Sequence, residues 1–201
     1  MRALIEHSRN AGAAYTVAKV LSDKPEAAGL ELARRLGVPA RALSGAESAD
    51  RAAHERALAG AISESSPSLI VLAGFMRILS APFVTQFAGR ILNIHPSLLP
   101  KFPGLHTHRR VLQAEEPLHG ATVHFVTEQL DGGPRVIQAR VAVSPDDDEA
   151  SLAARVQAVE HRIYPLAVQW FCEGRLRYDQ GCAWLDGQIL QGPVLFTDTR
   201  P

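Results

Sequence analysis

Cysteine is scarce in this 201-residue chain, which has only Cys172 and Cys182. Two cysteines are too few for a disulfide framework or a thiolate zinc site, so we expect a reducing, cytoplasmic location. An excess of charge of one sign is also missing, because 21 basic residues balance 21 acidic ones. This balance argues against a broad nucleic-acid-binding surface, and we expect no nucleic-acid partner.

Long hydrophobic runs are absent as well. The most apolar stretch, residues 68–75, is far shorter than the ~20 residues of a membrane-spanning helix, so we expect no membrane association. The first ten residues, MRALIEHSRN, do not read as a signal peptide. GxGxxG, P-loop and GxSxG motifs are missing too, which leaves dinucleotide, nucleoside-triphosphate and serine-hydrolase functions without support.

The pattern of hydrophobic residues alternates along the chain between the spacing of a strand and the spacing of a helix. Strands are predicted at residues 15–21, 38–43, 68–73 and 90–95, and helices at residues 3–13, 25–36, 49–63 and 81–87. The run at 68–73 is continuously apolar, which is typical of a strand buried on both faces. Strands that alternate with helices predict an α/β fold with a Rossmann-like, mainly parallel sheet and flanking helices.

The second half of the chain has a different character. Residues 120–126 and 135–143 predict an antiparallel pair of strands joined by the turn-rich TEQLDGGP. A long amphipathic helix follows at residues 148–173, and residues 176–190 predict a hairpin that turns at Asp186-Gly187. We therefore expect a single domain, residues 1–201, with an antiparallel C-terminal part.

The beginning of this pattern is unusual, because a parallel α/β domain normally opens with a strand. The first strand-to-helix loop of such a domain commonly binds an anionic ligand. This chain opens directly on a helix. Either the fold is unusual or an element is missing at the front.

The most specific segment is ILNIHPSLLPKFPGLHTHR, residues 91–109. Asn93 and His95 share one face at the carboxyl end of a strand, where open α/β sheets bind ligands. An imidazole there can move a proton, and an amide can donate to a developing oxyanion. The alternative is a histidine that only bonds backbone groups. His106 and His108 add no completing carboxylate or cysteine ligand, so we expect no metal.

A second constellation is the segment 127–134, TEQLDGGP. Its simplest interpretation is a turn in which Asp131 bonds its own backbone. If the turn brings Asp131 near His95, the carboxylate favours the imidazolium form as a general acid. Two other segments are unremarkable by themselves: residues 74–79 could line a site for a flat ring or simply pack, and Gln157 and Glu160 share a helix face that is typical of a solvated stripe.

Taken together, these segments resemble the folate-dependent formyltransferases. The superfamily pattern is Asn93-x-His95-Pro-Ser-Leu-Leu-Pro followed by Asp131-Gly-Gly. LAGFMRILS (72–80), LHTHR (105–109), HGATVHFVTEQLDGGP (119–134) and ARVQAVEHRIYP (154–165) are similar to the branch that formylates glycinamide ribonucleotide in purine synthesis. The resemblance covers essentially the whole chain.

The resemblance implies formyl transfer from 10-formyltetrahydrofolate to the amino group of glycinamide ribonucleotide, by a monomer or homodimer with small-molecule substrates. It implies Asn93, His95 and Asp131 as catalytic residues and His124 as a residue that supports them without touching the substrates. It also implies Gln157 and Glu160 at the glycinamide ribonucleotide. The folate-binding residues that it implies are Arg51, Met76, Arg77, Ile78, Leu79, Asn93, Thr127, Glu128, Gln129, Leu130 and Asp131. The alternatives are a folate-binding protein without transferase activity and a sister formyltransferase with another amine acceptor.

One departure concerns the front of the chain. Members of the family begin with an apolar strand and a Gly-x-Gly-Ser-Asn loop that holds the substrate phosphate, whereas this sequence begins at about the following residue. The resemblance therefore implies an N-terminally short chain that lacks the first strand. It divides the domain into a substrate- and phosphate-side half, residues 1–95, and a folate-side and C-terminal half, residues 96–201.

Overall fold

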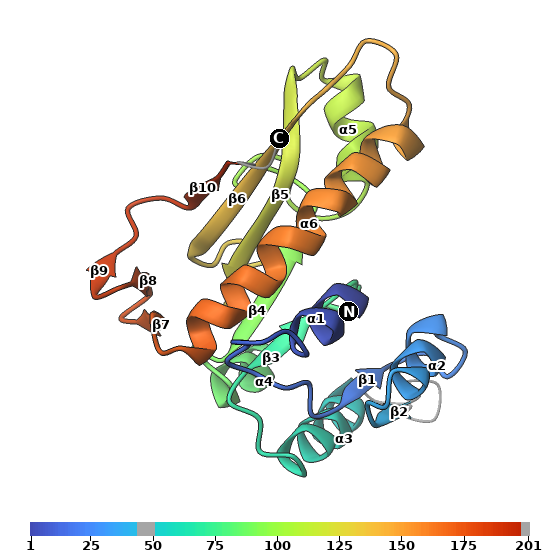
Figure 1. Cartoon of the computed structure of the whole chain (residues 1–201), viewed down its shortest axis with the longest axis vertical. Coiled ribbons are helices and arrows are strands. Elements are labelled where there is room, and N and C mark those ends of the chain that lie inside the picture. The colour runs from blue at the N-terminus through green and yellow to red at the C-terminus, as the bar shows by residue number, and fades with distance from the viewer. Residues whose placement is uncertain (44–50, 198–201) are drawn as a thin grey trace. The chain divides into compact units, whose positions relative to one another are not determined.

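The computed structural model describes residues 1–43 and 51–197. The chain forms two compact units, Met1–Ser68 and Leu69–Pro201. Each unit contains helices and at least one sheet (Figure 1).

The first unit contains a two-stranded parallel sheet. Its elements are α1 (Arg2–His7), β1 (Val20–Ser22), α2 (Ala28–Arg35), β2 (Ala40–Ala42) and α3 (Arg51–Ser63). Strands β1 and β2 are hydrogen-bonded neighbours that run in parallel, and α2 connects them along the chain, as predicted from the alternating pattern. Ile5, Ala33 and Val38 form one cluster of buried residues in this unit. The predicted start of α3 at residue 49 lies outside the described residues.

Four elements of this unit, α1, β1, α2 and β2, are shorter than predicted. Helix α1 ends at His7 instead of continuing to residue 13, because the Ser8 hydroxyl bonds the Ile5 carbonyl (2.8 Å) and Gly12 adopts φ +88°. Strand β1 covers three residues because it forms only where the three residues of β2 lie alongside it. Local propensity predicted the elements, and tertiary pairing set their lengths.

The second unit is built on a five-stranded mixed sheet in the order β10-β6-β5-β4-β3. The strands are β3 (Ile70–Leu72), β4 (Ile91–His95), β5 (Leu118–Phe125), β6 (Arg135–Ala142) and β10 (Val194–Phe196). β3 pairs in parallel with β4, whereas β4–β5 and β5–β6 are antiparallel. The α/β class and the antiparallel C-terminal part are thus confirmed, and β10, which pairs in parallel with β6, was not predicted.

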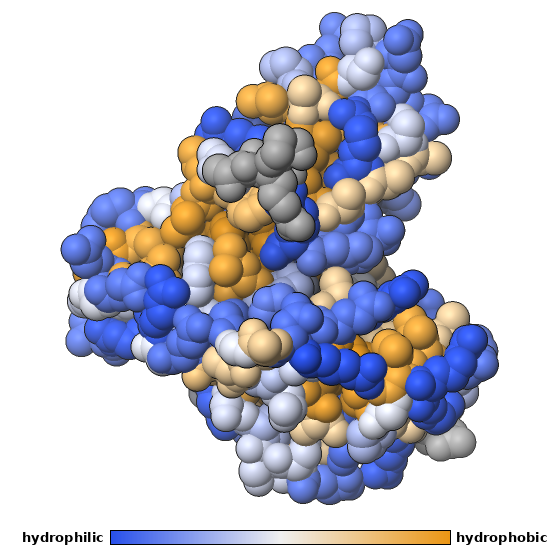
Figure 2. All heavy atoms as spheres, in the orientation of Figure 1, coloured by the Kyte–Doolittle hydropathy of each residue, from blue (hydrophilic) through white to orange (hydrophobic). Residues whose placement is uncertain are grey.

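Three helices and a small sheet complete this unit. The helices are α4 (Ala81–Gln86), α5 (Thr107–Gln113) and α6 (Glu149–Cys172), and the small sheet is β7 (Leu176–Asp179), β8 (Cys182–Leu185) and β9 (Gln188–Ile189). The 24-residue α6, orange in Figure 1, packs against β5 and β6. Figure 2 shows hydrophobic residues gathered over the middle of the second unit, with hydrophilic residues toward its ends.

The bounds of α6 agree with the predicted helix because strong local signals fix both ends. Asp148 is its N-cap and forms a capping box with Ser151, in which each side chain accepts a hydrogen bond from the backbone N–H of the other residue. Leu152, Val156 and Ile163 are 0% exposed and form the predicted buried stripe.

Two predictions for the second unit need correction. Residues 68–73 do not form a strand buried on both faces: β3 is half-buried because it is an edge strand of its sheet. The C-terminal segment forms three strands instead of one hairpin. The predicted turn at Asp186-Gly187 is present, with φ +51° and +81°, but a second turn at Gln180-Gly181 precedes it. Gln-Gly is a weaker turn signal than Asp-Gly, so the sequence did not reveal it.

Candidate active site

Strand β4 presents two polar side chains at its carboxyl end, as the alternation of the strand requires. Asn93 is half-buried, and His95, the last residue of the strand, is 6% exposed. The neighbouring strand β5 carries His124 opposite Asn93 and Thr122 opposite His95. The antiparallel pairing thus adds a second histidine to the predicted pair.

The connection between β5 and β6 brings Asp131 to the same place. Asp131 has φ +50°, a left-handed conformation that a non-glycine residue rarely adopts. A Cβ on Gly133 would lie only 1.8 Å from the Phe125 carbonyl oxygen, so the turn requires glycine there. The result is that Asp131 Oδ2 lies 3.5 Å from His95 Nδ1, with both side chains 8% exposed.

Two main-chain atoms of the loop after β4 complete the contacts of this pair. His95 Nε2 lies 2.9 Å from the Phe102 carbonyl oxygen, and Asp131 Oδ2 accepts from the Gly104 N–H (2.8 Å). Both ring nitrogens of His95 therefore face oxygen acceptors. The doubly protonated ring can donate to both, and it gives the buried carboxylate a charge partner.

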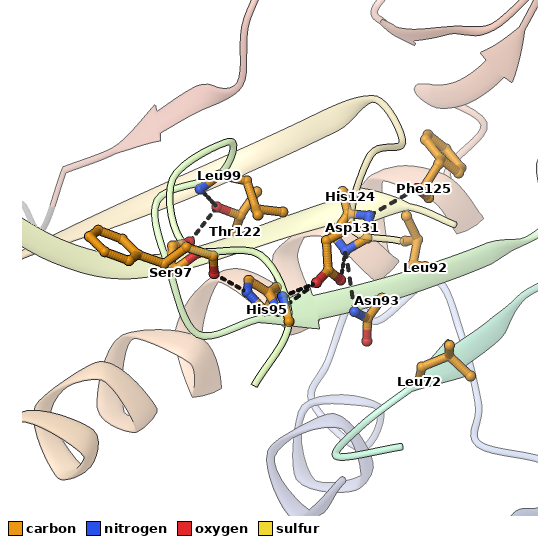
Figure 3. Close-up of polar contacts among 12 residues, drawn as sticks. Leu72, Leu92, Asn93, His95, Ser97, Leu99, Thr122, His124, Phe125 and Asp131 are labelled. Atoms are coloured by element: carbon orange, nitrogen blue, oxygen red, sulfur yellow. Dashed lines mark hydrogen bonds and ion pairs between the residues drawn. The ribbon is translucent and has the colours of Figure 1, made fainter. Parts of the chain in front are cut away.

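His124 links Asn93 to the same carboxylate. Figure 3 shows His95 and His124 directed at the two oxygens of Asp131, with His124 Nε2 3.7 Å from Oδ1. Because His124 Nδ1 faces the Phe125 carbonyl (2.9 Å), it carries the hydrogen, and Nε2 accepts from the Asn93 amide (3.2 Å). Burial lowers the pKa of His124, which favours this neutral form. One N–H of the Asn93 amide is left for a ligand.

The first half of the loop after β4 is held by a buried polar network. Thr122 Oγ1 donates to the Ser97 carbonyl (2.6 Å) and accepts from the Leu99 N–H (3.1 Å), as Figure 3 shows. Gln138 Nε2 and Arg135 Nη1 both donate to the Leu99 carbonyl, at 2.7 and 2.8 Å. These contacts fix the residues that directly follow His95.

A second histidine pair, which the sequence analysis missed, joins α5 to β5. His108 Nδ1 lies 3.0 Å from His119 Nε2, and His119 is only 1% exposed. Burial lowers the pKa of His119 to about 4, so it is neutral at neutral pH. No residue in the part of the chain that the structure describes bonds the buried His119 Nδ1, so the hydrogen sits on Nε2 and is donated to His108. The contact joins a helix to a strand, and no local pattern in the sequence indicates that these two residues meet.

The residues that the resemblance assigns to folate lie on segments that flank this cluster. Met76, Arg77, Ile78 and Leu79 follow β3, whose last residue pairs with Asn93. Thr127, Glu128, Gln129 and Leu130 form the connection that leads to Asp131. Met76, Ile78 and Leu130 are 71%, 62% and 54% exposed. Exposed large apolar side chains beside a polar cluster are typical of a ligand surface.

The remaining predicted site residues lie on two helices. Arg51 belongs to the first unit, on α3, with its Nε 3.3 Å from Glu55 Oε1. Gln157 is exposed and Glu160 is half-buried, three residues apart on α6. Burial raises the pKa of Glu160 to about 7, which separates it from an ordinary solvated carboxylate.

Residues 1–43 and 51–197 offer neither a cluster of metal ligands nor a membrane-spanning helix. Within these ranges, no group of three or more His, Cys, Asp or Glu side chains could hold a metal ion. No helix in the same ranges combines the length and the apolar character needed to cross a membrane.

One α/β unit thus gathers an asparagine, two histidines and an aspartate at the end of a strand. The formyl transferase family model matches residues 1–168, and the chain belongs to this family. The chain is 50% identical over 190 residues to the phosphoribosylglycinamide formyltransferase of Escherichia coli K12, a match that covers 94% of this chain and 90% of that protein.

Solved structures show the same fold. The phosphoribosylglycinamide formyltransferase of Coxiella burnetii superimposes with a TM-score of 0.92 at 42% identity, covering 98% of this chain and 93% of that one. The glycinamide ribonucleotide transformylase 1 of Symbiobacterium toebii gives a TM-score of 0.88 at 43% identity, covering 92% and 87%. The α/β architecture predicted from the sequence is the architecture of these enzymes.

Proposed function

We propose that this chain is an enzyme that transfers a formyl group from 10-formyltetrahydrofolate to the amino group of glycinamide ribonucleotide, a step of purine synthesis. The observation that carries the proposal is the buried cluster in which the carboxylate of Asp131 faces His95 at 3.5 Å and His124 at 3.7 Å. The names of the relatives support the choice of substrate.

The orientation of three side chains supports this chemistry. 10-Formyltetrahydrofolate supplies the formyl carbon that the substrate amine attacks, forming the new N–C bond. The free N–H of Asn93 and the protonated ring of His95 stabilise the negative charge that develops on the formyl oxygen. Asp131 holds the protonated ring and, through water, passes the proton of the amine to the folate nitrogen as the old C–N bond breaks.

The surroundings of the cluster fit a folate ring. A flat heterocycle needs apolar faces and a few polar groups at its edge. Met76, Ile78 and Leu130 supply exposed apolar surface, and the backbone from Thr127 to Asp131 supplies polar groups. Arg77 and Leu79 complete the folate-binding set that we propose for this unit.

The acceptor is held by other residues. We assign Gln157 and Glu160, on one face of α6, to the glycinamide ribonucleotide, because a half-buried carboxylate with a raised pKa is suited to a hydrogen bond with an uncharged donor. Both cysteines are free, which supports the expected reducing cytoplasm. Small-molecule substrates need no further partner, and we propose a monomer or homodimer.

The test is turnover by Asp131→Asn and His95→Asn with the two substrates. Asp131→Asn keeps the size of the side chain and removes its charge, and His95→Asn removes the imidazole that donates the proton, so we expect kcat to fall by about 10²- to 10⁴-fold. Asp146→Asn, an exposed aspartate, is the matched control and should keep its activity. Thermal unfolding should show that all three variants fold.

Two results would contradict the proposal. Wild-type protein that binds a folate analogue but transfers no formyl group would favour the folate-binding alternative. Transfer to another amine in preference to glycinamide ribonucleotide would favour a sister formyltransferase. Near-normal turnover of Asp131→Asn would leave the overall reaction standing and overturn the assigned role of Asp131.

A further inference from the structure

The loop between β4 and α5 contributes two main-chain atoms to the catalytic pair. The Phe102 carbonyl faces His95 Nε2 at 2.9 Å, and the Gly104 N–H donates to Asp131 Oδ2 at 2.8 Å. The geometry of both side chains therefore depends on the conformation of residues 102–104. This segment has no regular secondary structure to hold it.

The backbone of this segment is in an unfavourable conformation. Phe102 has φ +54° and His106 has φ +58°, in the left-handed region where a side chain other than that of glycine is strained. Such a conformation persists only where surrounding contacts enforce it. The network around Thr122 and Gln138 reaches Leu99 but acts on the first half of the loop.

Contacts from one side chain of α5 reach the second half. Arg110 Nη1 donates to the Pro103 carbonyl (2.6 Å) and to the Leu105 carbonyl (3.3 Å). Its guanidinium carbon lies 5.4 Å from the centre of the Phe102 ring, within the range of a cation–π contact. The three contacts fall on residues 102, 103 and 105, so they flank both main-chain atoms that touch the catalytic pair.

We propose that Arg110 is a positioning residue, whose guanidinium holds residues 102–105 so that the Phe102 carbonyl meets His95 and the Gly104 N–H meets Asp131. The planar guanidinium can donate to two carbonyls while its face lies against an aromatic ring, which a lysine ammonium cannot do in the same way. The catalytic consequence rests on the proposed formyl transfer. The structural consequence for His95 does not depend on it.

The decisive variants are Arg110→Met and Arg110→Lys. Methionine keeps an apolar side chain but has no charge and no hydrogen-bond donors, and lysine keeps the charge but lacks the planar guanidinium. We expect Arg110→Met to lower kcat by about 10- to 100-fold, the size of effect that a small displacement of catalytic groups produces, while KM changes by less than about 3-fold. Arg110→Lys should recover only part of the loss. If Arg110→Met does not fold, the lysine variant still carries the comparison.

A readout that needs no substrate separates this proposal from the proposed function. The Nε2–H of His95, hydrogen-bonded to Phe102, should give a slowly exchanging proton signal in the NMR spectrum, assigned by its loss in His95→Asn. We expect Arg110→Met to shift this signal and to speed its exchange. A wild-type protein without transferase activity would overturn the proposed function but leave this measurement intact.

The matched control is Arg109→Met, the preceding residue on α5, whose Nε pairs with Glu149 Oε2 at 3.1 Å on an exposed surface. It should leave the His95 signal unchanged and keep kcat near the wild-type value. If Arg110→Met keeps the wild-type kcat and His95 signal, or if Arg109→Met shows equal losses, the positioning role of Arg110 is overturned.

Discussion

At the scale of single residues, His119 shows most clearly how burial sets the charge of a group. The ring is 1% exposed, and its pKa falls from an ordinary 6.5 to about 4. Burial is the main cause, and the neighbouring His108 and His95 add to it. Between about pH 4 and 6.5, His119 is therefore neutral in the folded state and protonated in the unfolded chain.

Acidification should destabilise the protein through this residue. Between pH 6.5 and about 4 the unfolded chain binds a proton at His119 and the folded chain does not, so the free energy of unfolding falls as the pH is lowered through this window. The full contribution is about 3 kcal/mol by the usual conversion of a pKa difference. Urea unfolding of wild type and His119→Gln at several pH values measures it.

The comparison with the variant is needed because Glu160 changes the free energy of unfolding with pH in the opposite direction. Its raised pKa, about 7, contributes stability at low pH that is lost as the pH rises from 4.5 to 7. The difference between wild type and His119→Gln cancels this contribution. Equal pH dependence of the two proteins would contradict the assignment of a neutral, buried His119.

The residues of the candidate site could be predicted from the sequence only in part. Strand alternation put Asn93 and His95 on one face, and the structure places them there with Asp131 and His124. The contacts from the Phe102 carbonyl and the Gly104 N–H could not be predicted, since every residue has the same main-chain groups. His119 was missed because its partner reaches it only through tertiary folding.

At the scale of elements, Tyr164 of α6 links the helix to two strands. Its hydroxyl lies 2.8 Å from the Leu72 carbonyl and 2.9 Å from the Leu92 carbonyl, the first on β3 and the second on β4. The residue is 4% exposed, and burial raises its pKa well above the ordinary value, so the hydroxyl stays protonated as a donor. One hydrogen is shared by two carbonyls of adjacent strands.

Removing this hydroxyl should cost stability. We expect Tyr164→Phe to lower the free energy of unfolding by about 1–2 kcal/mol, because two buried carbonyls lose a donor. Tyr178→Phe is the control, because the Tyr178 ring lies 5.5 Å from the Phe125 ring and no residue within the described ranges bonds its hydroxyl. It should change stability by less than about 0.5 kcal/mol. Denaturant unfolding that gives equal losses for both variants would contradict the linking role of Tyr164.

Elements with strong local signals were predicted closely and short strands were not. The capping box at Asp148 and a long apolar stripe fixed α6 within a residue at each end. β10 and β9 have three and two residues, too few for a period of two to be recognised. Their positions are decided by pairing partners far away in the chain, which propensity cannot encode.

At the scale of the whole molecule, the two units differ in how deeply they bury their sheets. In the second unit, seven of the eight residues of β5 are buried. In the first unit, β1 and β2 contain only half-buried and exposed residues and form a sheet of two strands. A two-stranded sheet with little buried surface opens locally at low free-energy cost.

Hydrogen exchange should therefore be faster in the first unit. After correction for intrinsic rates, we expect the amides of β1 and β2 to exchange at least about 10-fold faster than those of β5 and β6 under native conditions. Exchange followed by NMR or by peptide mass spectrometry resolves these segments. Equal protection of the two sheets would show that the chain opens as one cooperative body.

The main-chain contacts to His95 and Asp131 have a consequence for how this site can be studied. Every amino acid carries a carbonyl at position 102, and every amino acid except proline carries an N–H at position 104. An alanine scan of the loop therefore leaves both hydrogen-bonding groups in place and cannot measure what they contribute. Only chemistry on the backbone itself, such as replacement of the Gly104 amide by an ester, deletes the donor to Asp131 while leaving every side chain intact.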